Sequence, residues 1–248
     1  MIEAQTTKQQ LQKQEHQMRQ HFHTIYDKHS TIYDRLVERE DFAGNLLKTL
    51  RAIVSLEGLE VVEWGAGTGR VTRLLAPEVR TLQAFDGAEA MLDLARQRTT
   101  QWSHLQFQVA LHHEIPVEDN SADLGIEGWS FAHLTEELPE NEGLQAVQQA
   151  LKEMQRVVRP GGMMVLIETL GTGTETPAPS ERLQVLYEHL EKQGFQHRWC
   201  RTDYRFSSQQ EAEELLGFFF GQEMLEKLNR EEWTLPECTG FWFRQNAR

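Results

Sequence analysis

Apolar and polar positions along the chain change their spacing in blocks, and the blocks predict strands and helices in turn. Short apolar runs between polar or glycine-containing segments predict strands. These runs are Leu59–Trp64, Thr81–Phe85, Leu105–Ala110, Ala122–Ile126, Met163–Glu168, Phe195–Arg201 and Thr239–Phe243. Apolar residues at helical spacing predict helices. These helices are Gly69–Leu75, Ala88–Arg98, Glu142–Val158, Glu181–Gln193 and Ser208–Arg230, preceded by a helical stretch over Phe22–Leu56.

The alternation of strands and helices predicts an α/β fold, a doubly wound parallel sheet with helices on both faces and right-handed crossovers. Residues 1–21 are rich in glutamine, lysine and histidine, which predicts a polar helix or a disordered tail. Residues 22–248 are expected to form one domain. Within it, residues 202–237 form a helical insertion that interrupts the last two strands, either a helix packed on the periphery or a lid over a site.

Composition narrows the function classes. The 248 residues carry a formal net charge of −13 and no long basic run, which argues against nucleic acid or an anionic membrane as the main partner. Two cysteines and no apolar run long enough to span a bilayer favour a reducing, cytoplasmic location. The oligomeric state cannot be read from these features.

The segment from Glu63 to Arg70, Glu-Trp-Gly-Ala-Gly-Thr-Gly-Arg, predicts a strand that turns into a helix around a ligand. A dinucleotide site has the spacing Gly-x-Gly-x-x-Gly, whereas this segment has Gly-x-Gly-x-Gly with Arg70 in the third glycine position. A carboxylate at Glu63 would repel a pyrophosphate and suits a cationic ligand better. Asp86 follows the second predicted strand, 21 residues after Gly65. It is expected to accept both ribose hydroxyls of a nucleoside, the alternative being a cap on the next helix.

Four segments occur in an order and spacing that resembles the class I S-adenosylmethionine-dependent methyltransferases, in particular those of ubiquinone and menaquinone biosynthesis. They are the glycine turn, the Asp86 segment, Ile115–Leu124 and the Arg-Pro-Gly-Gly end of the helix before Met163. The resemblance implies a seven-stranded, mostly parallel sheet whose last strand is antiparallel, with S-adenosylmethionine as the cofactor. It also implies cofactor contacts at Glu63, Gly65, Ala66, Gly67, Gly69, Asp86, Gly87, Met91, Leu111, His112, Glu127, Gly128 and Trp129. Many members carry an acidic residue where Leu111 stands, so the backbone of Leu111 and His112 would have to replace that contact with the adenine.

The candidate catalytic group is His133, which follows the fourth strand and could act as a general base, the alternative being that it packs at a helix start. Candidates for the acceptor pocket are Tyr26, Tyr33, Tyr204 and Arg205. The histidines have no spacing typical of metal ligands, so no metal site is expected.

The resemblance implies transfer of a methyl group to an oxygen, nitrogen or carbon atom of a small molecule. Two alternatives stay open at this stage. One is a methyltransferase-like protein that binds S-adenosylmethionine without turnover, and the other is an NAD-dependent oxidoreductase.

Overall fold

The computed structural model describes residues 30–247. Tyr26 and the expected polar segment at residues 1–21 therefore lie outside the described residues. No helix within residues 30–247 is both long and apolar enough to cross a bilayer.

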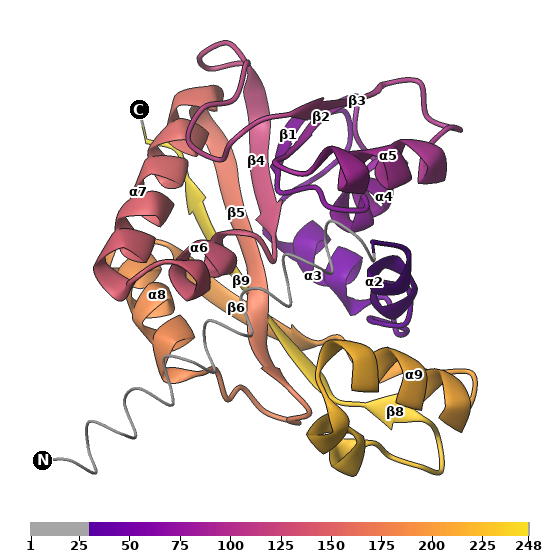
Figure 1. Cartoon of the computed structure of the whole chain (residues 1–248). Coiled ribbons are helices and arrows are strands. Elements are labelled where there is room, and N and C mark those ends of the chain that lie inside the picture. The colour runs from indigo at the N-terminus through magenta and orange to yellow at the C-terminus, as the bar shows by residue number, and fades with distance from the viewer. Residues whose placement is uncertain (1–29, 248) are drawn as a thin grey trace, which may run out of the picture.

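A seven-stranded sheet forms the centre of the molecule, with the strand order β3-β2-β1-β4-β5-β9-β6 (Figure 1). Its strands are β1 (Glu60–Trp64), β2 (Thr81–Asp86), β3 (Leu105–Val109), β4 (Ala122–Gly128), β5 (Val158–Thr172), β6 (Gln196–Arg201) and β9 (Glu237–Gln245). The first five run parallel, while β9 lies antiparallel between β5 and β6. The predicted α/β class, the doubly wound sheet and its antiparallel last strand are confirmed.

Helices cover both faces of this sheet (Figure 1). They are α2 (Ser30–Val37), α3 (Asn45–Ile53), α4 (Arg70–Leu75), α5 (Glu89–Arg98), α6 (Phe131–Glu137), α7 (Glu140–Val157), α8 (Glu181–Lys192) and α9 (Gln209–Phe219). One apolar cluster joins the sheet to α6, α7 and α8, with Trp64 and Met154 at its centre. A second cluster joins the opposite face to α3, α4 and α5 through Leu50, Leu75 and Leu92. Val61 of β1 packs in the second cluster while Val62 and Trp64 pack in the first, which is why apolar residues are needed on both faces of this strand.

Several predicted elements differ in extent from the observed ones. The helical stretch expected up to Leu56 is divided into α2 and α3 in the described residues, and β9 extends the strand expected at Thr239–Phe243 at both ends. The strand expected at Met163–Glu168 is longer at both ends, since β5 begins directly after α7 and continues to Thr172. The helix expected over Ser208–Arg230 is broken, because Gly221 takes a positive φ of 86° that ends α9. A short 3₁₀ helix, η1 (Gln222–Lys227), follows the break.

Residues 202–237 form an insertion between β6 and β9, and α2 packs against it. The insertion contains α9, η1 and a two-stranded ribbon of β7 (Tyr204–Arg205) and β8 (Thr234–Leu235). Its apolar side chains form a third cluster with Leu36 of α2. Two ion pairs join this part of the chain to α9: Arg35 of α2 with Glu214 at 2.6 Å, and Arg39, which follows α2, with Glu211 at 2.7 Å. We call residues 30–40 and the insertion together the cover.

Candidate functional site

The glycine turn after β1 has a conformation that its glycines make possible. Gly65, Gly67 and Gly69 all have positive φ angles, of 63°, 53° and 82°. A Cβ atom on Gly65 would lie 2.0 Å from the Ser130 hydroxyl oxygen, so this position also needs glycine for space. The turn therefore brings bare backbone from β1 against the segment that follows β4.

Asp86, at the end of β2, joins this turn to the next one. Its Oδ2 atom accepts a hydrogen bond from the Gly67 N–H at 2.8 Å, and Oδ1 accepts one from the Ala88 N–H at 2.8 Å. Burial raises the pKa of Asp86, and these backbone hydrogen bonds act in the opposite direction. The carboxylate still lines a cavity, and each of its oxygens can accept a further hydrogen bond.

Glu63 lies below the turn with 1% of its surface exposed. The Thr72 hydroxyl donates a hydrogen bond to Glu63 Oε2 at 2.6 Å. Burial raises the pKa of Glu63 to about 8, although the Thr72 hydrogen bonds lower it. A cation placed beside Glu63 would therefore stabilise a charge that the protein alone disfavours.

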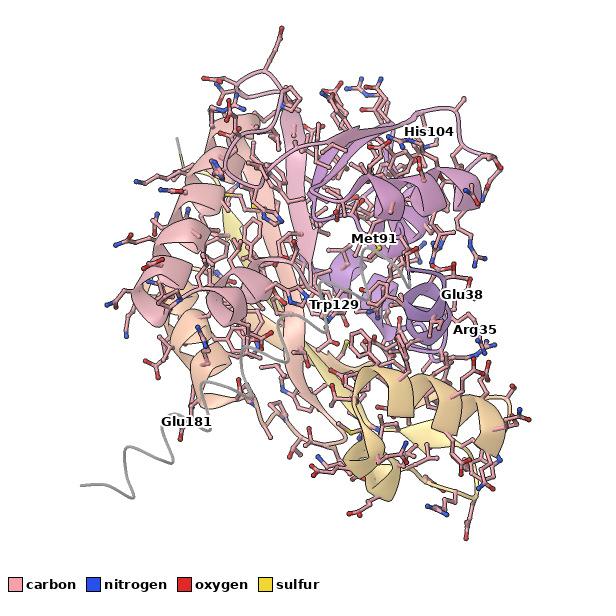
Figure 2. All side chains as sticks on the ribbon, viewed as in Figure 1. Arg35, Glu38, Met91, His104, Trp129 and Glu181 are labelled. Atoms are coloured by element: carbon pink, nitrogen blue, oxygen red, sulfur yellow. The ribbon has the colours of Figure 1, made fainter. Side chains whose placement is uncertain are left out.

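These groups face a cavity of about 430 Å³ at the carboxyl ends of β1, β2 and β4. All the expected cofactor contacts line it except Gly69 and Glu127. Figure 2 shows two of the lining residues, Met91 of α5 and Trp129 after β4, near the centre of the molecule. This is where ligands of open α/β sheets bind.

Gly69 and Glu127, also expected to contact the cofactor, do not line this cavity. A Cβ atom on Gly69 would lie 3.1 Å from Ala95 Cβ, so this glycine lets α4 and α5 pack closely. The Glu127 carboxylate is buried and accepts hydrogen bonds from the N–H groups of Ser130 at 3.1 Å and Phe131 at 3.3 Å. Gly69 thus contributes to packing between α4 and α5, and Glu127 holds the backbone that follows β4.

Arg70 also lines the cavity. This position was not predicted from the sequence, where Arg70 was interpreted only as a departure from the dinucleotide pattern. Its Nη1 atom lies 2.8 Å from Glu40 Oε2, and its guanidinium carbon lies 3.7 Å from the centre of the Trp129 ring. Burial lowers the pKa of Arg70, but the Glu40 charge outweighs this and keeps the group cationic. The Nη2 atom is buried and has no hydrogen-bond partner within residues 30–247. One donor of a buried cation therefore remains available to a ligand.

Leu111 and His112 border the same cavity in different ways. Leu111 is 59% exposed and lies at the rim. The His112 ring is held by a 2.7 Å hydrogen bond between Nε2 and the Ser130 hydroxyl, and its backbone carbonyl accepts one from Trp64 Nε1 at 3.2 Å. Burial lowers the pKa of His112 to about 4, with smaller contributions from the neighbouring histidines, so the ring is neutral at pH 7. No carboxylate takes the place of Leu111 in the described wall.

A second cavity, of about 220 Å³, lies between the first cavity and the cover. Tyr33, Arg70, Trp129 and His133 line both cavities. Trp129 adopts a φ of 53°, which is rare for a bulky side chain and is held by a 2.7 Å hydrogen bond from its N–H to the Ile167 carbonyl. The two cavities therefore meet at a wall that the fold holds in one conformation.

The candidates for the acceptor pocket divide between the second cavity and the surface. Tyr33 and the buried Tyr204 line the second cavity, and His133 borders it with Nδ1 at 3.9 Å from Glu136 Oε2. Arg205 lines neither cavity, because its guanidinium lies over the ring of Phe42 at 3.8 Å on the outer side of β7.

Known proteins are similar to this chain in sequence and in fold. Residues 62–166 match the family model of a methyltransferase domain. Over this region, which is less than half of the chain, the sequence is similar to methyltransferase domains. The matched region extends from β1 into β5 and so includes the glycine turn, Asp86 and Trp129.

The chain spans only part of the length of the curated relatives that it matches. Demethylmenaquinone methyltransferase of Staphylococcus aureus is 28% identical over 153 residues, which span 59% of this chain and 59% of that protein. A solved methyltransferase of Aquifex aeolicus, described as S-adenosylmethionine-dependent, superposes with a TM-score of 0.50 at 17% identity and covers 79% of this chain and 87% of its own. The [4+2]-cyclase SpnF superposes with a TM-score of 0.56 at 18% identity, covering 81% of this chain and 79% of its own. At sequence identities of 17% and 18%, these two structures show a similarity of fold alone.

Proposed function

We propose that this protein transfers a methyl group from S-adenosylmethionine to a small molecule. The observation that carries the proposal is the meeting of two cavities at the Arg70–Trp129 wall, one beside the glycine turn and Asp86, the other beneath the cover. Two reactants bound in these adjoining cavities can react without a covalent bond between substrate and protein. Alignment and exclusion of water then supply most of the rate acceleration.

The residues of the first cavity fit the donor part by part. Asp86 has free lone pairs for the two ribose hydroxyls, and Met91, Leu111 and His112 give an apolar edge for the adenine. The unpartnered Nη2 of Arg70 can bind the carboxylate of the methionyl part, and Glu63 offers a carboxylate to its cationic groups. When bound, the cofactor supplies a methyl group that is already activated by its sulfonium charge.

The protein's own contribution is to hold, orient and enclose the reactants. Trp129 is fixed by its backbone hydrogen bond to Ile167 and by Arg70 on its ring. Tyr33 and Tyr204 are side chains of the cover that line the second cavity. His133 borders both cavities, so its imidazole is placed to accept a proton from the acceptor.

Two alternatives compete with this proposal. An NAD-dependent oxidoreductase is disfavoured because Glu63 would face a pyrophosphate and Arg70 replaces the third glycine of that fingerprint. A binding protein without methyl transfer keeps some support, because a cyclase shares this fold.

Parallel calorimetric titrations with S-adenosylmethionine and with NAD test the donor assignment. We expect binding of S-adenosylmethionine alone, and binding of NAD alone would overturn the proposal. Release of S-adenosylhomocysteine in a screen of small acceptors then separates an enzyme from a binding protein, which would release none with any acceptor.

We also propose that residues 22–248 act as one domain with residues 202–237 as its lid, and that the protein works in the cytoplasm. Two free thiols, Cys200 and Cys238, support a reducing compartment. Its partner in the reaction would be a small-molecule acceptor.

A further inference from the structure

The second cavity has an unusual lining for its size of about 220 Å³. It combines carboxyl groups with aromatic rings and has one guanidinium. The carboxyl groups are Glu40, Glu136, Glu168 and Glu237, and the rings are Tyr33, Trp129, Tyr204, Phe219 and Phe220. Carboxylates and ring faces both attract a positive charge.

Arg70 neutralises only one of these carboxyl groups, Glu40, with which it is paired. Its guanidinium is bonded to Glu40 at 2.8 Å and lies on the ring of Trp129. Glu168 and Glu237 form no ion pair within the described residues, although both are almost fully buried. Glu168 instead accepts a 2.7 Å hydrogen bond from the Ala132 N–H.

Glu237, the first residue of β9, is the most informative of these groups. Only 2% of its surface is exposed. Its Oε1 atom accepts a 2.7 Å hydrogen bond from the Thr169 hydroxyl. Its Oε2 atom is buried and has no hydrogen-bond partner in residues 30–247. Leaving such an acceptor buried and unpaired is unfavourable, and a cation placed beside it would offset that loss.

We propose that the acceptor held in this cavity is a compact amine that binds as a cation, with its nitrogen between the aromatic rings and Glu237. This rests on the proposed methyl transfer and names its acceptor class. A neutral quinone-type acceptor carries no charge for these carboxyl groups to attract.

The chemistry balances with groups that are present. Burial and the Glu40 charge raise the pKa of Glu237 to about 8, and a bound ammonium would lower it again, so that the carboxylate forms beside the cation. The ammonium then gives one proton to this carboxylate, and its nitrogen regains a lone pair. A new N–C bond then forms as the S–C bond of the donor breaks, and the electron pair of that bond stays on sulfur. The methylated ammonium leaves with S-adenosylhomocysteine, and the carboxyl group returns its proton to solvent.

Two matched probes test recognition of the cation without relying on turnover. Choline carries a permanent positive charge, and 3,3-dimethyl-1-butanol has the same shape with a neutral carbon in place of nitrogen. Calorimetry with the full chain should show choline binding at least tenfold more tightly than the neutral alcohol. Equal affinities, or no choline binding at millimolar concentrations, would overturn the proposal.

Two variants test whether Glu237 is the carboxyl group that recognises the cation. Glu237→Gln keeps the size of the side chain and the acceptor for Thr169, and we expect it to weaken choline binding at least tenfold without changing binding of the alcohol. Glu223→Gln removes the same charge from an exposed position of the insertion and should change neither. Thermal melts show whether each variant is folded, and unchanged choline affinity in folded Glu237→Gln would contradict the assignment.

A turnover comparison separates this proposal from the one on which it rests. Small amines and neutral phenols or quinols are incubated with the protein and S-adenosylmethionine, and S-adenosylhomocysteine is measured. Release with amines supports both proposals. Release with phenols or quinols alone would refute the amine assignment while leaving methyl transfer standing, and failure of S-adenosylmethionine to bind would refute the methyl transfer itself.

Discussion

The guanidinium carbon of Arg70 lies 3.7 Å from the centre of the Trp129 ring, and both residues line both cavities. Arg70 opens α4, directly after the glycine turn, whereas Trp129 follows β4. Their contact therefore joins the ends of two neighbouring strands. Glu40 fixes the guanidinium from the cover side at 2.8 Å, so one cation links the donor side of the site to the cover.

Removing the Arg70 guanidinium is expected to weaken S-adenosylhomocysteine binding at least tenfold, about 1.4 kcal/mol. The physical reason is the loss of the Nη2 donor proposed for the ligand carboxylate. Arg70→Met alone would leave Glu40 buried and unpaired, so the informative comparison is Glu40→Gln with and without Arg70→Met. Calorimetry gives the affinities.

Two controls make that result specific. The ligand 5′-methylthioadenosine has the nucleoside but no carboxylate, so the Arg70→Met change should leave its affinity nearly unaltered. Arg51→Met removes a half-exposed arginine paired with Glu78 and should affect neither ligand. Equal losses for both ligands would mean that Arg70 shapes the cavity and does not bind the carboxylate.

Asp86→Ala should weaken S-adenosylhomocysteine binding at least tenfold, about 1.4 kcal/mol. Because Asp86 also accepts backbone hydrogen bonds from Gly67 and Ala88, a loss of affinity alone could come from a disturbed turn. The 2′-deoxy analogue of the ligand resolves this. It should bind the native protein more weakly than the parent ligand and should bind Asp86→Ala as well as the parent does. Discrimination that survives in Asp86→Ala would remove this carboxylate from ribose recognition.

The sheet and the first cavity were predictable because they depend on local sequence. Several strands contain a short apolar run, and the glycine turn and Asp86 lie at the carboxyl ends of β1 and β2. Neighbouring parallel strands end at the same edge, so residues at their carboxyl ends converge whatever the rest of the chain does. The break at Gly221 was less visible, because apolar residues continue on both sides of it.

The second cavity could not be predicted, because its wall is assembled from distant segments. Glu40, Glu168 and Glu237 come from the segment after α2, from inside β5 and from the start of β9. Nothing in their spacing relates them, and they meet only when α2 and the insertion pack together. A carboxylate inside the apolar run of β5 was a signal for Glu168, since a charge in a buried strand needs a partner or a function.

Gly65→Ala is expected to destabilise the protein by about 1–3 kcal/mol more than Gly58→Ala does. Both glycines have positive φ angles, 63° and 75°, so the backbone penalty is similar. A Cβ atom at position 58 would meet nothing within 4 Å, whereas one at position 65 would lie 2.0 Å from Ser130 Oγ and 2.3 Å from its Cβ. Urea unfolding of the two variants measures the difference.

A compensating change tests the steric cause. Ser130→Gly removes both atoms that would collide with the new methyl group, at the cost of the hydrogen bond to His112. The double variant Gly65→Ala/Ser130→Gly should therefore be less destabilised than the sum of the two single changes. Strict additivity would show that the collision is relieved in some other way.

Glu63→Gln should become relatively more stabilising as the pH rises. The pKa of Glu63 is raised by burial from its ordinary 4.5 to about 8, so between these values the folded protein holds a proton that the unfolded chain has released. Stability must then fall with rising pH, by up to about 1.4 kcal/mol per pH unit for this one group, and the dependence ends below 4.5 and above 8. Glutamine cannot ionise and can still accept a hydrogen bond from the Thr72 hydroxyl. Glu63→Gln therefore removes the contribution of this group to the pH dependence of the free energy of unfolding.

Urea unfolding at about pH 5 and about pH 8 should show that the free energy of unfolding of Glu63→Gln rises relative to that of the native protein as the pH increases. The exposed Glu118→Gln serves as the matched control and should show a constant difference. A constant difference for Glu63→Gln as well would mean that Glu63 is ionised in the folded protein throughout this range.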